Sequence, residues 1–152
     1  MIRLLLALAA ASPIAAPTAA EPPLRLRDAQ AMVAQAERTA LAQKIPMSIV
    51  VVNQEGRVIL AERMDGAAFQ SVEVAQSKAT TAGSLGIPTI EVEKAIAGGA
   101  TNLLSLHGLV ALAGGVPVFR DGQLIGGIGA SGGSDEQDAA VAGAGAAALP
   151  KQ

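Results

Sequence analysis

Two overlapping glycine motifs lie between a strand-like run and a helix-like run, a position that suits a nucleotide site or a nucleophile. Residues 127–132 read Gly-Ile-Gly-Ala-Ser-Gly and match the GxGxxG pattern of dinucleotide-binding proteins. Such a site also needs a second parallel strand that ends in an acidic residue about 20 residues further on. The sequence offers only one more helix there. We therefore expect these glycines to let the strand pack tightly against a helix or another subunit.

Residues 129–133 also match GxSxG, the nucleophile elbow of α/β-hydrolases, with Ser131 in the place of the nucleophile. The catalytic histidine follows the serine in that fold, whereas the one histidine of this chain, His107, precedes Ser131. A Ser–His pair assembled in another way stays open. The simpler interpretation makes Ser131 a turn or helix-entry residue whose hydroxyl group bonds nearby backbone.

Metal chemistry is restricted by the side chains that the sequence offers. There is no Cys and one His, so a Cys/His zinc site cannot be built within one chain. The carboxylates are scattered singly, apart from Asp135, Glu136 and Asp138. We assign these three to the first turn of the last helix, where they complement the helix dipole without an ion.

The sequence has few groups with which to bind nucleic acid. It contains two Phe and no Trp or Tyr, which leaves little for stacking on bases. Its formal net charge is -2, and no stripe of Lys and Arg stands out that would neutralise phosphates. We therefore expect no DNA or RNA partner.

Residues 1–20 are typical of an export signal, so residues 21–152 are expected to form the mature protein as one domain. A short positive start precedes an apolar run at residues 4–11 and a stretch of small residues at 15–20. The apolar run is shorter than the roughly 20 residues that a membrane span needs. We expect a soluble periplasmic or secreted protein with no membrane insertion after cleavage.

The spacing of apolar residues predicts the helices and strands that would position any site. Thr89 is a suitable helix cap, and Ser134 with Gln137 forms a capping box for the last helix, which runs to Leu149. The expected elements are a helix over 29–41, strands over 47–53 and 58–61, helices over 71–85 and 89–97, strands over 109–112, 116–120 and 124–130, and the last helix.

This order, α-β-β-α-α-β-β-β-α, predicts an α/β fold of the α+β type. Consecutive hairpins imply a five-stranded antiparallel sheet with helices on its faces. The domain has few large side chains, and its faces are rich in glycine and alanine. Such faces suit close contact between subunits, so we expect a homo-oligomer.

Four segments of the sequence form a specific combination. They are SIVVVNQEGRVILAERMDGA at residues 48–67, VAQSKATTAG at 74–83, GGVPVFRDGQLIGGIGASGG at 114–133 and SDEQD at 134–138. Together they resemble the GlcG/HbpS family of haem-binding and glycolate-operon proteins, which also includes the C-terminal domain of PduO-type proteins. The resemblance extends from about residue 24 to about residue 149.

The resemblance implies a profilin-like α-β-α sandwich, higher-order oligomers and, for several members, binding of haem or a related tetrapyrrole. Exported members look like extracytoplasmic haem-binding proteins. Asn53 stands where the first strand of many relatives ends in Asp, so this chain lacks a charge at that position. The most specific motifs are Arg63-Met64-Asp65, Lys78-Ala79, Gly114-Gly115-x-Pro117 and Ser131-Gly132.

The expected ligand-binding residues come from these motifs and from the histidine: Arg63, Met64, Asp65, Lys78, His107, Gly115, Pro117 and Ser131. Arg63 and Lys78 either meet ligand carboxylates or propionates, or pair with Asp65 or a Glu at the surface. Met64 is either core filler or a soft contact or iron ligand. His107 is the obvious haem ligand by residue type, and its loop position equally suits a solvent-exposed side chain.

Three functional hypotheses follow. The first is an exported oligomer that binds haem or a similar planar small molecule and is not itself an enzyme. The second is an enzyme or accessory protein for small hydroxy acids, suggested only by the glycolate-operon relatives and opposed by the lack of a credible acid/base pair. The third is a structural or sensory-partner oligomer whose ligand is incidental.

Overall fold

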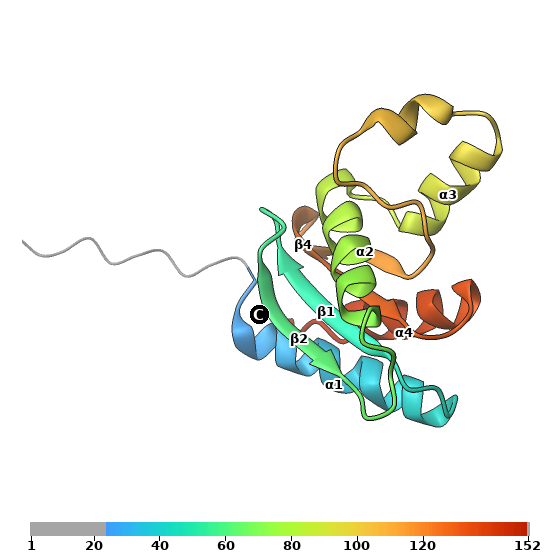
Figure 1. Ribbon diagram of the computed structural model, residues 1–152. Coiled ribbons are helices and arrows are strands. Elements are labelled where there is room, and N and C mark those ends of the chain that lie inside the picture. The colour runs from blue at the N-terminus through green and yellow to red at the C-terminus, as the bar shows by residue number, and fades with distance from the viewer. Residues whose placement is uncertain (1–23, 152) are drawn as a thin grey trace, which may run out of the picture.

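A computed structural model of the chain describes residues 24–151, and the predicted export signal lies outside them. These residues form an α+β fold in which a four-stranded antiparallel sheet lies between helices (Figure 1). No helix among them combines the length and apolar character needed to cross a bilayer. The elements are α1 (Leu26–Ala42), β1 (Ser48–Asn53), β2 (Val58–Arg63), α2 (Ser71–Leu85), α3 (Thr89–Ala97), the 3-10 helix η1 (Thr101–Ser105), β3 (Gly115–Arg120), β4 (Gln123–Ser131) and α4 (Asp135–Ala147).

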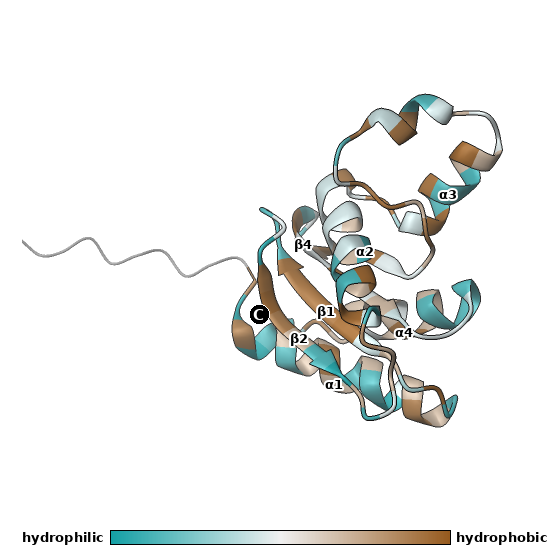
Figure 2. Cartoon of the chain, viewed as in Figure 1, coloured by the Kyte–Doolittle hydropathy of each residue, from teal (hydrophilic) through white to brown (hydrophobic). Residues whose placement is uncertain are grey.

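The strands are ordered β2-β1-β4-β3, which places β1 and β4 in the centre. β1 is a continuous apolar run because it is covered on both faces. Ile49 and Val51 pack with α1 and α4, whereas Val50 and Val52 pack against α2. Figure 2 shows this hydrophobic strand running through the middle of the sheet.

The prediction of a fifth strand over residues 109–112 is wrong. The backbone N–H of Val110 donates to Thr81 Oγ1 at 3.0 Å, and that of Ala113 donates to Glu93 Oε2 at 3.0 Å. The backbone here is thus bonded by side chains of α2 and α3 rather than by a neighbouring strand. An apolar run alone does not distinguish these two arrangements.

The glycines of the GxGxxG motif lie where α2 packs directly on β4. A Cβ atom at Gly127 would collide with the Ala79 carbonyl, and one at Gly129 would collide with the Ala75 carbonyl. On the helix side, a Cβ atom at Gly83 would lie 3.1 Å from the Gly127 nitrogen. The expectation that these glycines allow close helix packing is confirmed.

Of the two helix caps predicted from the sequence, the structure confirms Ser134 and contradicts Thr89. Ser134 caps α4 as predicted, since its Oγ accepts from the Gln137 N–H at 3.4 Å while Gln137 Oε1 accepts from the Ser134 N–H at 2.8 Å. Thr89 is not the cap of α3, because Pro88 occupies that position. Thr89 is instead buried, and its Oγ1 accepts from the backbone N–H of Gly115 at 2.9 Å.

Candidate functional site

Lys78 lies in the middle of α2, and only 3% of its side chain is exposed. Its Nζ donates to Asp138 Oδ2 at 2.6 Å and to the Ala130 carbonyl at 3.2 Å. The other carboxylate oxygen of Asp138 accepts from the Gly133 N–H at 2.8 Å. This ion pair therefore joins α2, α4 and the end of β4 through the interior.

The pair corrects two expectations from the sequence. Lys78 pairs neither with Asp65 nor with a surface Glu, and Asp138 is not a surface residue that only complements the dipole of α4. Burial explains both, because a charge removed from water needs a counter-charge and hydrogen bonds within reach. The carboxylate of Asp138 supplies them from 60 residues further along the chain.

Gly114 and Gly115 make room for this buried pair. Gly114 has a φ of +110°, and a Cβ atom there would lie 3.1 Å from Lys78 Nζ. A Cβ atom at Gly115 would collide with the carbonyl of Lys78. Gly115 thus has a packing role beside α2, in addition to its bond with Thr89.

The Arg63-Met64-Asp65 triplet lies at the end of β2 and divides between surface and core. Met64 is half-buried against the main core, and its Sδ accepts from the Met47 N–H at 3.4 Å, as expected of a core-filling residue. Arg63 and Asp65 are exposed. The Arg63 guanidinium donates to the Ala67 carbonyl at 2.6 Å and lies 4.7 Å from the centre of the Phe69 ring.

Pro117 and Ser131 lie in the sheet. Pro117 is half-buried in β3, an edge strand, where a proline is tolerated because one side of the strand is unpaired. Ser131 ends β4 opposite Ser48 and is 9% exposed. It therefore lacks the exposed position that the serine of a nucleophile elbow occupies. Within the described part of the chain, no hydrogen bond joins Ser131 to His107.

His107 follows η1 and is exposed. The next residue, Gly108, lines a groove of about 380 Å³ between α2 and the segment before β3. From α2 the groove is lined by Glu73, Val74 and Ser77, and from the segment by Gly108, Leu109, Val110 and Leu112. The sole imidazole of the chain is therefore adjacent in sequence to the wall of a largely apolar groove.

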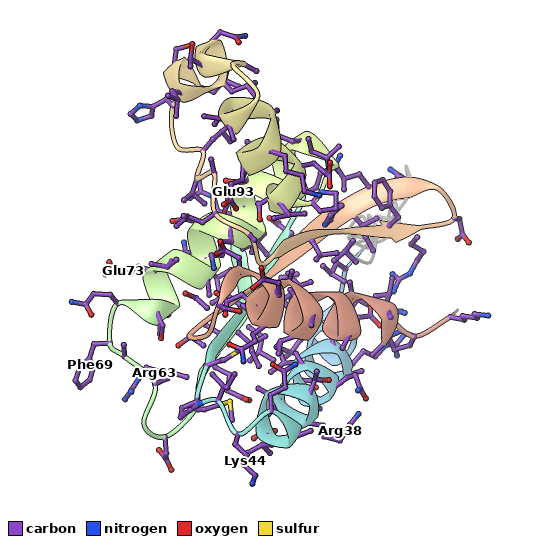
Figure 3. All side chains as sticks on the ribbon, turned by 90° about the vertical axis from the view of Figure 1, so that its right-hand side faces the viewer. Arg38, Lys44, Arg63, Phe69, Glu73 and Glu93 are labelled. Atoms are coloured by element: carbon purple, nitrogen blue, oxygen red, sulfur yellow. The ribbon has the colours of Figure 1, made fainter. Side chains whose placement is uncertain are left out.

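Figure 3 shows Glu73, Phe69 and Arg63 along one side of the molecule, from α2 through the loop before it to the end of β2. Phe69 is 82% exposed, the highest value among the large apolar side chains that the structure describes. We call the groove together with His107, Phe69 and Arg63 the α2 face. The α2 face includes two of the expected site residues, His107 and Arg63, whereas Lys78, Gly115 and Ser131 lie in the interior.

Phe69 was missed by the sequence analysis, although an aromatic residue in a chain with two Phe was a usable signal. The groove residues carry no such signal, because Leu109 and Val110 look like an ordinary strand. Among residues 24–151, no cluster of three His, Asp or Glu side chains is placed to hold a metal ion.

Residues 24–147 match the model of a family described as haem degrading protein HbpS-like. The chain belongs to this HbpS-like family, as the sequence resemblance implied. It is 36% identical to HbpS of Streptomyces reticuli, solved as a double mutant, with a TM-score of 0.79 over 93% of this chain and 99% of that one.

The chain is also similar to PduO-type proteins and to GlcG. The structure of a PduOC–haem complex is 32% identical, with a TM-score of 0.73 over 83% of this chain and 96% of that one. The chain spans only 37% of the full corrinoid adenosyltransferase PduO of Salmonella typhimurium. Protein GlcG of Escherichia coli is 37% identical over 103 residues, which cover 68% of this chain and 77% of GlcG.

Proposed function

We propose that this protein binds haem or a related tetrapyrrole on the α2 face, and that it does so as an exported oligomer. The proposal rests on the groove between α2 and residues 108–112, whose wall adjoins His107. A relative that shares the fold has been solved as a haem complex. Ligand sites are typically apolar hollows with a few polar groups that fix orientation, and this face has that composition.

The apolar lining of the groove suits contact with the apolar part of a macrocycle. Leu109, Val110 and Leu112 form one wall, and Val74 on α2 forms the other. Leu112 is 43% exposed, so much of its surface is available to a ligand. Contact with a planar apolar ring would remove this surface from water, at about 25 cal/mol per Å² buried.

The propionates of a haem need cations, and the face supplies Arg63. Its guanidinium is exposed, carries a fork of donors and already stacks on Phe69. We assign the propionate contact to Arg63 rather than Lys78, because the ammonium of Lys78 is bonded to Asp138 inside the fold. Moving it outward would leave the Asp138 carboxylate buried without its counter-charge.

His107 is our choice for the nitrogen ligand of the iron. Haem iron bound by a protein usually takes an axial nitrogen, sulfur or oxygen donor, which sets its spectrum and reactivity. His107 is exposed and directly precedes Gly108 in the groove wall, whereas the sulfur of Met64 accepts a backbone N–H and packs on the core. His107 can therefore turn toward a ligand without disturbing the interior.

A second copy of the chain would complete the site. At about 380 Å³ the groove is at the lower end of the range for ligand pockets, so it covers one face of a macrocycle rather than enclosing it. Leu104 and Leu106, which are 67% and 45% exposed, lie on the segment that leads into the groove. Exposed leucines of this kind suit a contact between subunits.

Titration of the purified protein with haemin, followed by the Soret band, tests the ligand. We expect a saturable change; in His107→Ala the Soret maximum should shift, and in Arg63→Ala it should stay in place while affinity falls about 5- to 150-fold. Lys94→Ala, which removes an exposed cation on α3, is the matched control and should bind normally. No saturable Soret change in the wild-type protein would refute haem binding.

Two further measurements test oligomerisation and export. Light scattering should give a mass above that of one chain, and a strictly monomeric protein at micromolar concentration would contradict the oligomer.

Intact-mass measurement of the periplasmic or secreted protein should place its first residue near Glu21. A cytoplasmic product that keeps residues 1–20 would contradict export.

A further inference from the structure

A cationic pocket lies on the other side of the sheet from the α2 face. It has a volume of about 440 Å³ and is lined by Arg25, Arg27, Asp28, Pro150 and Lys151. In Figure 1 the segment after α4 returns to the start of α1, so residues from the two ends of the described part of the chain meet there. Helix α1 and helix α4 cover this face of the sheet, whereas α2 covers the opposite one.

The floor of the pocket is a buried carboxylate with its charge already balanced. Asp28 is 2% exposed, and its Oδ2 accepts from the Arg25 N–H at 3.0 Å and contacts Arg120 Nη2 at 3.1 Å. Burial alone would raise the pKa of Asp28, but the Arg25 N–H and the Arg120 guanidinium outweigh it and hold this pKa below its ordinary value. Asp28 therefore remains ionised and holds Arg25 and Arg120 beside it.

Two more cations add charge that Asp28 does not balance. Arg27 and Lys151 are both exposed and line the same hollow. The backbone N–H groups that begin α1 carry partial positive charge and add to it. In a chain with a formal net charge of -2, this is a local excess of positive charge that suits an anion.

A second hollow with a partly apolar lining adjoins the cations. It has a volume of about 490 Å³ and shares Pro150 and Lys151 with the first pocket. Its other lining residues are the apolar Phe119, Ala146, Ala147 and Leu149 and the charged Arg120 and Asp121. The ring of Phe119 is 47% exposed at the edge of the sheet. A ligand that fills both hollows would place a charged end among the arginines and an apolar end against Phe119.

We propose that this double pocket binds a small amphiphilic anion, an organic acid whose carboxylate meets Arg27 and Lys151 and whose apolar part lies against Phe119 and Leu149. Guanidinium groups match carboxylate oxygens in geometry, as Asp28 already demonstrates at this place. This site is separate from the proposed haem site, and it does not depend on haem binding.

Calorimetric titration with octanoate tests the proposal, with acetate and inorganic phosphate as comparison probes. Octanoate should bind, whereas acetate and phosphate, which lack the apolar part, should bind at least tenfold more weakly. Arg27→Ala and Lys151→Ala should each weaken octanoate binding about three- to tenfold, as expected for loss of one partly exposed charge-assisted contact. Phe119→Ser should weaken octanoate binding and leave acetate unchanged.

Arg38→Ala is the matched control, because Arg38 lies on the same helix but is exposed and bonded to Gln35. It should bind octanoate as the wild-type protein does. Octyl phosphate included as a further probe identifies the head group: much tighter binding than octanoate would overturn the carboxylate assignment in favour of a phosphate ester.

Two outcomes would overturn the site itself. One is the absence of heat with octanoate at millimolar concentration in wild-type protein that is shown to be folded. The other is a loss of haemin affinity in Arg27→Ala and Lys151→Ala equal to their loss of octanoate affinity, because the pocket would then serve the haem propionates. Normal octanoate binding together with a failed haemin titration would support this site and refute the haem proposal.

Discussion

The centre of the fold and the lobe formed by α3 and η1 are built in opposite ways. Around Lys78, a buried ion pair and several glycines hold α2, α4 and the strands at close distance. The lobe stands away from the sheet in Figure 1, and its buried residues are Thr89 and Val92 in α3 and none in η1. Its apolar side chains, such as Leu104, face solvent.

This difference separates the buried motif residues from the exposed residues to which we assign ligand contacts. Lys78, Gly115 and Ser131 belong to the motifs by which the sequence resembles its family, and each lies in the part where neighbours leave little room. Arg63, from another of these motifs, is exposed at the end of β2. His107 and Arg63, to which we assign the iron and propionate contacts, are both exposed. The buried motif residues therefore report the architecture, and the exposed residues, Arg63 among them, are the ones that we propose for ligand contact.

The largest effect should come from breaking the ion pair. Asp138→Ala leaves the ammonium of Lys78 buried without a counter-charge, so the free energy of unfolding should fall by about 3–5 kcal/mol. Urea unfolding followed by circular dichroism measures this loss. Asp135→Ala, which removes an exposed carboxylate from the same helix turn, should change stability by less than about 1 kcal/mol. Equal losses in the two variants would mean that burial of the pair does not matter.

A smaller loss should follow from filling the contact between α2 and β4. Gly129→Ala would place a Cβ atom against the Ala75 carbonyl and should lower the free energy of unfolding by about 1–3 kcal/mol. Gly143→Ala is the matched control, since nothing lies within 4 Å of a Cβ atom there. Alanine is the better helix former by about 1 kcal/mol, so that variant should be slightly more stable. A stabilised Gly129→Ala would contradict the close packing.

In the lobe formed by α3 and η1, by contrast, a substitution should change the mass of the oligomer more than the stability of the fold. Leu104→Ser removes an exposed apolar side chain and should change the free energy of unfolding by less than about 0.5 kcal/mol. If the lobe forms the contact between copies, the same variant should shift the mass measured by light scattering toward that of one chain. A variant that loses stability while keeping its mass would assign Leu104 to the fold and not to an interface.

The smallest expected effects are on how stability depends on pH. They come from two carboxyl groups, Glu62 and Asp28, whose pKa values are shifted in opposite directions. Burial, and to a lesser extent repulsion by Glu37, raises the pKa of Glu62, one of whose oxygens is buried without a partner. A raised carboxyl pKa contributes stability below the ordinary value, which is lost as the pH rises through the raised value. Glu62→Gln should remove this decline in thermal stability.

Asp28 should show the reverse dependence, because its pKa is lowered. Its contribution to stability is present above the ordinary carboxyl pKa and is lost as the pH falls through the lowered value. Asp28→Asn should therefore make stability less sensitive to acid. Melting temperatures of both variants over the acidic range check the two signs, and parallel changes in the two would contradict them.

Much of the fold was predictable because local patterns identify their own elements. The bounds predicted for α2 and α3 match the structure, since a glycine ends the first and Pro88 precedes the second. The strand predicted at residues 109–112 failed because its backbone partners, Thr81 and Glu93, are side chains far away in sequence. Local periodicity contains no information about such partners.

The sites were less predictable for the same reason. The partner of Lys78 lies on another helix, and the first turn of α4 gave Asp138 a sufficient local explanation as a dipole partner. The double pocket combines residues from the start of α1, the end of β3 and the segment after α4. No stretch of sequence is basic there, so inspection of the sequence could not find it.

The burial of Lys78 also makes its amine a chemical reporter. Acylating reagents attack a neutral, accessible amine, and Lys78 Nζ is enclosed and bonded to Asp138 and to the Ala130 carbonyl. Exposed amines such as those of Lys44 and Lys94 should be acylated quickly, whereas Lys78 should react only when α2 and α4 separate. The rate at which mass spectrometry finds Lys78 modified would then measure how often the whole domain opens in solution.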